Sequence, residues 1–140
     1  MNNEKSIEFV NRLIDMTMNN SLVWKHYSDG DINFKDDFGV FFHTEFCTLD
    51  SSKSFFTILD TNFIILAFET ITSAIDGSFE KEFRLLVGED GKHGYISEVK
   101  FNDDPYALLS ELSYHIKDSM HNADEKADAF INAVLNNQIL

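Results

Sequence analysis

Hydrophobic positions along this 140-residue chain change their spacing twice, from helical to alternating and back to helical. Over residues 4–19 the apolar side chains recur every three or four positions, as on one face of an amphipathic helix; they are Ile7, Val10, Leu13, Ile14 and Met18. Asn19-Asn20-Ser21 follows, and asparagine tolerates the left-handed conformation that closes a helix. We therefore expect a first helix that ends there, and then a short extended stretch over 22–27.

The middle of the chain predicts a sheet. The run from Phe63 to Phe68 is apolar at every position, as in a strand that is covered on both faces. Asp76-Gly77 is a hairpin signal, and a clean alternation of apolar and charged residues follows it. Short turns make neighbouring strands antiparallel, because a parallel crossover needs a dozen or more residues. We expect about five strands, at 39–49, 54–60, 63–72, 79–87 and 95–101.

Two helices are predicted after the sheet. Asp104 and Pro105 read as an acidic N-cap followed by proline at the first helical position. Asn122, with Glu125 three positions later, makes a capping box, which predicts that a third helix begins there. The apolar stripe of the earlier helix is Leu109, Leu112, Ile116 and Met120, and that of the later one is Ala127, Phe130, Ile131, Val134 and Leu135.

The predicted fold class is therefore α+β, a single domain over residues 1–140. It has an N-terminal helix, an antiparallel meander sheet of about five strands, and two C-terminal helices. Both faces of the first two strands carry apolar residues, which a sheet with one face in water does not show. Either helices cover both faces, or a second copy of the chain closes part of one face as a homodimer.

Charge narrows the range of partners. The chain has 24 acidic and 11 basic residues, a net charge of −13. Nucleic-acid binding depends on clustered Lys and Arg, and anionic membranes attract the same residues, so we expect neither partner. A basic protein surface would be attracted, although acidity also serves solubility alone. The single cysteine and a start that lacks the features of a secretory signal predict a cytoplasmic protein.

Motifs for metal binding and nucleophilic catalysis are incomplete. Asp29-Gly30-Asp31-Ile32-Asn33 begins like a calcium loop, but Phe34 and Val40 replace the glycine and the glutamate that complete one. His115, Asp118 and His121 follow one side of a helix without the i, i+4 histidine pair of zinc enzymes. His43 and Cys47 would lie about 13 Å apart along a strand, too far for direct proton transfer. We assign no catalytic residue, no metal and no cofactor.

Two carboxylates deserve separate mention. Glu45 and Glu69 occur in otherwise apolar strands, where burial raises the pKa of a carboxyl group. If both faced one cavity, they would work as an acid and a base. Positions at an edge or facing solvent are the more common explanation.

An aromatic segment followed by an acidic loop is the candidate partner-binding site. Tryptophan and tyrosine are favoured at binding hot spots because they combine a large rigid surface with a polar tip. The candidate residues are Trp24, His26, Tyr27, Asp29, Asp31, Asp36 and Asp37. The alternative is that Trp24 fills the core between helix and sheet.

Three short features stand out along the chain: the Thr-containing turn before Trp24-Lys25, the segment Gly94-Tyr95-Ile96-Ser97-Glu98, and the leucines at 108, 109 and 112. In these features and in its layout, the chain resembles small acidic helix–meander–helix proteins of Firmicutes and their mobile elements. It implies a bacterial, non-enzymatic accessory role, for instance in phage or mobile-element biology, and it carries over no catalytic residues.

These observations lead to three hypotheses. The first is a non-enzymatic acidic protein-binding module, of accessory or inhibitor type, that engages a partner with a basic surface. The second is a small-ligand-binding domain or an enzyme with a pocket between sheet and helices, which the Phe-rich strands favour. The third is a purely structural homodimer subunit.

Overall fold

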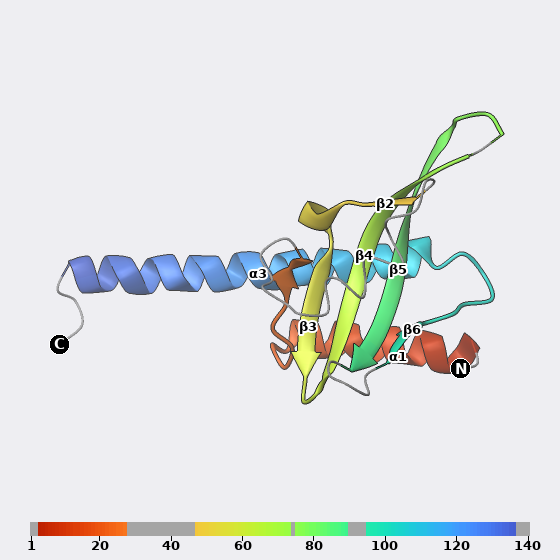
Figure 1. Cartoon of the computed structure of the whole chain (residues 1–140). Coiled ribbons are helices and arrows are strands. Elements are labelled where there is room, and N and C mark those ends of the chain that lie inside the picture. The colour runs from red at the N-terminus through yellow and green to blue at the C-terminus, as the bar shows by residue number, and fades with distance from the viewer. Residues whose placement is uncertain (1–2, 28–46, 74, 90–94, 137–140) are drawn as a thin grey trace.

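The computed structural model describes residues 3–27, 47–73, 75–89 and 95–136 (Figure 1). The elements are α1 (Asn3–Met18), β1 (Lys25–His26), β2 (Cys47–Leu49), the 3₁₀ turn η2 (Ser51–Lys53), β3 (Phe55–Leu59), β4 (Asn62–Thr72), β5 (Phe79–Glu89), β6 (Ile96–Glu98) and α3 (Tyr106–Leu135). The α+β class is confirmed.

The strands form one antiparallel sheet in the order β1-β3-β4-β5-β6, with β2 paired to β4 as a sixth strand. β3 to β6 are the predicted meander, since each strand pairs with the next along the chain. β2 and β3 both pair with β4, opposite residues 69–71 and 62–66 respectively. Of the strand predicted over 39–49, only Cys47–Leu49 lies within the described residues, as β2.

Both described helices lie on one face of the sheet (Figure 1). The main core forms there, where Val10 and Leu13 of α1 and Leu109, Leu112 and Ile116 of α3 pack with Ile64 and Leu66 of β4. The alternate residues of β4, which are Phe63, Ile65 and Ala67, face the other way and belong to a second cluster. All five residues from Phe63 to Ala67 are buried, which confirms the expected strand covered on both faces. The described helices, however, cover only one of those faces.

The end of α1 and the entry to β1 follow the expected local chemistry. Asn20 adopts a left-handed φ of 63° just after the helix ends, and the backbone N–H of Ser21 donates to the Met16 carbonyl at 2.8 Å. The chain then turns back so that the indole Nε1 of Trp24 donates to Thr17 Oγ1 at 3.0 Å. This hydrogen bond satisfies a polar group that the core would otherwise leave unpaired.

α3 corrects the prediction of two C-terminal helices, because it is one continuous helix of 30 residues. His121 Nε2 and Glu125 Oε1 lie 3.1 Å apart across the predicted break, an i, i+4 pair that supports a continuous helix. An asparagine N-cap stabilises a helix by about 1 kcal/mol, whereas ending the preceding helix would leave four carbonyls without partners. No Gly or Pro falls between 106 and 135 to force the break.

The Thr17–Trp24 hydrogen bond gives a first prediction. We expect Thr17→Val to lower the free energy of unfolding by about 1–3 kcal/mol, because the buried indole N–H of Trp24 loses its acceptor. Urea unfolding followed by circular dichroism measures the change. In a Trp24→Phe background the same substitution should cost clearly less. An equal cost in both backgrounds would show that the hydrogen bond does not contribute.

Candidate protein-binding surface

α3 is longer than the body against which it packs. At 1.5 Å per residue, its 30 residues extend about 45 Å, against about 24 Å for the 16 residues of α1. The two helices run in the same direction, and α3 continues well past the end of α1 and past the sheet (Figure 1). We call residues 121–135 the projecting half of α3. All of them are exposed except Ala133, which is half-buried.

An apolar stripe follows the projecting half. It consists of Ala127, Phe130, Ile131, Val134 and Leu135, as the sequence predicted. The four large side chains are between 48% and 73% exposed. At 100° per residue, the stripe continues the face that Leu109, Leu112 and Ile116 bury in the core. Contiguous exposed apolar residues of this kind mark interaction sites on soluble proteins.

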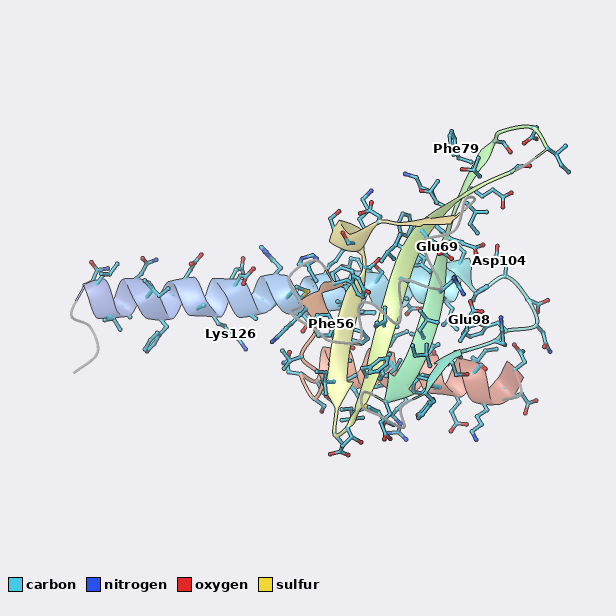
Figure 2. All side chains as sticks on the ribbon, in the orientation of Figure 1. Phe56, Glu69, Phe79, Glu98, Asp104 and Lys126 are labelled. Atoms are coloured by element: carbon cyan, nitrogen blue, oxygen red, sulfur yellow. The ribbon has the colours of Figure 1, made fainter. Side chains whose placement is uncertain are left out.

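Acidic side chains accompany the stripe. The projecting half carries three acidic residues, Asp124, Glu125 and Asp128, and one lysine, Lys126. All four are exposed. Figure 2 shows side chains extending from both sides of this part of α3, which lies beyond the sheet, with Lys126 on one of these sides. The projecting half is therefore an amphipathic helix with an acidic polar face.

A groove of about 930 Å³ lies at the root of the projecting half. One wall comes from the end of α1 and the turn after it, with the exposed side chains of Met18 and Val23. The other wall is α3, which contributes Tyr114 and the carboxylates of Asp118, Asp124 and Glu125. The groove thus combines exposed apolar side chains with acids, and it is continuous with the projecting half through residues 122–126 and 129.

Of the seven residues predicted to contact a partner, the structure describes Trp24, His26 and Tyr27. Trp24 and Tyr27 are only 4% and 6% exposed, so Trp24 fills the core, the alternative that the sequence left open, and only borders the groove. His26 is half-buried against the ring of Phe55, with the ring centroids 5.0 Å apart. Asp29, Asp31, Asp36 and Asp37 lie outside the described residues, as do the calcium-like motif, His43 and Glu45. A partner contact by those aspartates stays a prediction.

The second face of the sheet holds a cluster of charged residues. Arg84 Nε lies 2.6 Å from Glu98 Oε1 and 3.4 Å from Glu69 Oε1, and Lys100 Nζ contacts the other oxygen of Glu98. The Glu69 side chain is 1% exposed, so the edge or solvent-facing position that we considered more common is wrong for Glu69, and the alternative of burial holds. Arg84 lies between the two carboxylates and pairs with both. This arrangement is typical of a structural ion-pair network rather than of an acid–base pair.

Two pKa values record the electrostatics of this cluster. Burial, together with the nearby charge of Glu69, raises the pKa of Glu82, whose partner across the β4–β5 ladder is Glu69. Burial would also raise the pKa of Glu98, but hydrogen bonds from Arg84 and Lys100 outweigh it and hold this pKa below its usual value. The folded protein therefore disfavours the charged form of Glu82 and favours the charged form of Glu98.

No family model, curated protein or solved structure matches this chain. Within the described ranges, no three His, Cys, Asp or Glu side chains are grouped so that they could hold a metal ion. No helix in that part of the chain has both the length and the apolar character to cross a membrane.

The charged cluster gives a prediction with opposite signs at two positions. Because the pKa of Glu82 is raised in the folded protein, binding of a proton to Glu82 stabilises the folded state. This stabilisation is fully present below the usual pKa of 4.5 and is lost as the pH rises through the higher folded pKa. Glu82→Gln, which keeps the neutral form, should therefore stabilise the protein by about 0.5 kcal/mol at pH 7. The gain should vanish below about pH 4.

Glu98 behaves in the reverse way. Its ion pairs stabilise the folded state above the usual pKa of 4.5, and the contribution is lost as the pH falls through the lowered folded pKa. Glu98→Gln should cost about 1 kcal/mol at pH 7. Urea unfolding of both variants between pH 3 and 7 tests the pair. Changes of the same sign would contradict this account of the cluster.

Proposed function

We propose that the protein is a non-enzymatic, acidic protein-binding module whose projecting half of α3 engages a partner protein. The partner presents an apolar groove with a basic rim. The observation that supports this most directly is the apolar stripe, with four large side chains 48–73% exposed on a helix that extends beyond the domain.

The spacing of the stripe suits a helix-in-groove complex. Ala127, Phe130, Ile131 and Val134 follow the i, i+3, i+4, i+7 pattern by which amphipathic helices fill such grooves. Full burial of a Phe, Ile, Val or Leu side chain contributes about 1.5–3 kcal/mol. The helix is already formed and joined to a folded domain, so the free energy of binding is not spent on ordering the backbone.

Charge selects the kind of partner. Three carboxylates and one ammonium group give the projecting half a net charge of −2, and the whole chain carries −13. A basic rim would add attraction at the edge of the complex and speed association at low salt. The same charge disfavours a second copy, because two projecting halves would bring like charges together.

The groove at the root of α3 extends the proposed contact. A basic side chain of the partner that enters beside Tyr114 would meet the ring face, which attracts cations. It would also meet the carboxylates of Asp118 and Glu125, which line the same groove. The proposed interface therefore has an apolar part on the stripe and an acidic part in the groove.

The partner can be found and the contact tested in two steps. A photo-crosslinking residue, p-benzoylphenylalanine, is placed at position 130 of the full chain in native cells, and the same residue at position 75 is the control. Ile75 is 97% exposed at the β4–β5 turn, away from α3. We expect a partner that is crosslinked at position 130 and not at position 75.

Affinity for the purified partner then tests the stripe. The double variant Phe130→Ser/Ile131→Ser should weaken binding about 100-fold or more, because central apolar anchors each contribute about 2 kcal/mol or more. Ile75→Ser/Phe79→Ser removes two apolar side chains that are even more exposed than Phe130 and Ile131 and should change affinity less than twofold. Binding should also weaken as salt is raised from about 50 to 300 mM.

Other occupants of the stripe are distinguishable outcomes. Light scattering that gives twice 16.1 kDa for the wild type, and the monomer mass for Phe130→Ser/Ile131→Ser, would overturn the proposed partner in favour of a homodimer. A crosslinked partner with an acidic contact surface, or one whose affinity is indifferent to salt, would overturn the basic rim.

A further inference from the structure

A second cavity, of about 460 Å³, lies between the first turns of α1 and the end of the sheet at the β3–β4 turn. Its volume is within the range of about 300–1,000 Å³ in which small-molecule sites fall. It shares no lining residue with the groove at the root of α3. Whatever occupies it is therefore independent of the proposed protein partner.

The walls of this cavity are mainly apolar. Phe9 of α1 faces Ile64 of β4 and Val87 of β5, and Leu59 at the end of β3 is 43% exposed at the rim. Phe63 forms part of the wall and is itself only 2% exposed. An apolar body of ligand size would find contacts on several sides.

Polar side chains also line this cavity. Asn62 Nδ2 lies 3.4 Å from the Tyr95 hydroxyl, and the ammonium-bearing Lys5 of α1 lines the same space. These three groups all offer hydrogen-bond donors, which an anionic oxygen accepts. Asp60, on the β3–β4 turn, also lines the cavity; its carboxylate repels any anion, so among anionic ligands one with a single negative charge is opposed least.

We propose that this cavity binds a small amphipathic monocarboxylate. The apolar body packs against Phe9, Ile64 and Val87, and the carboxylate accepts hydrogen bonds from Lys5 and from the Asn62–Tyr95 pair. A few polar groups on an otherwise apolar wall are the usual composition of a small-ligand site.

Two fluorescent probes of nearly the same shape test the proposal. The anion 1-anilinonaphthalene-8-sulfonate stands in for the carboxylate ligand, and N-phenyl-1-naphthylamine is its neutral counterpart. Both are titrated into the full chain carrying Phe130→Ser/Ile131→Ser, so that the apolar stripe of α3 does not contribute. We expect saturable binding at one site, with tighter binding of the anion.

Matched substitutions separate charge from apolar contact. Lys5→Gln should weaken binding of the anionic probe by about threefold to tenfold and leave the neutral probe within about twofold, while Lys25→Gln changes neither. Leu59→Ser should weaken both probes, whereas Ile58→Ser should weaken neither. Ile58 is the neighbouring exposed residue of β3 and does not line the cavity.

Three results would overturn the proposal: no saturable binding of either probe, equal losses in the test and control variants, or equal effects of Lys5→Gln on both probes. The amide signals of Phe9, Asn62 and Tyr95 in a proton–nitrogen spectrum should shift on adding the anionic probe. Because the stripe is already removed in this background, these outcomes do not depend on whether α3 binds a protein.

Discussion

The organisation of this protein depends on a mismatch in length, since α3 has 30 residues and the helix beside it has 16. The apolar face of α3 runs without interruption from Leu109 to Val134, and the hydrophobic effect acts equally on both halves of it. Only the first half lies against the sheet and α1, where Leu109, Leu112 and Ile116 are fully buried. The folding of the described residues therefore leaves the second half with apolar surface whose burial can stabilise a complex.

Local signals in the sequence predicted much of the fold because the chemistry behind them acts over a few residues. Asn20 takes the left-handed φ that ends α1. The Asp104 carboxylate accepts from the backbone N–H of Tyr106 at the start of α3, although Pro105, predicted as the first helical residue, is itself the N-cap. Gly77 likewise has a positive φ of 71° in the turn before β5. The continuous burial of Phe63–Ala67 follows from a sequence that offers no polar position to solvent. Each of these features is decided within one turn or one strand.

The errors arose where a local signal competed with its surroundings, or where contacts join distant parts of the chain. Asn122 and Glu125 match the pattern of an N-cap, but asparagine is also tolerated inside a helix, and the flanking residues favour the continuation of α3. Periodicity showed correctly which side chains form the stripe, but it does not show whether anything covers them. The groove brings Met18 and Val23 together with Tyr114 and Asp118, about 100 positions apart in the sequence. No spacing rule encodes that contact.

The fold also distributes charge more unevenly than the composition suggests. Arg84 and Lys100 are engaged by Glu98 on the second face of the sheet, so they add little positive potential elsewhere. The projecting half carries three carboxylates and ends at a helix C-terminus, where unpaired carbonyls contribute a partial negative charge. No basic residue occupies its last turn to offset that charge. Negative potential and exposed apolar surface therefore coincide on the projecting half of α3, and a basic rim around an apolar groove complements both.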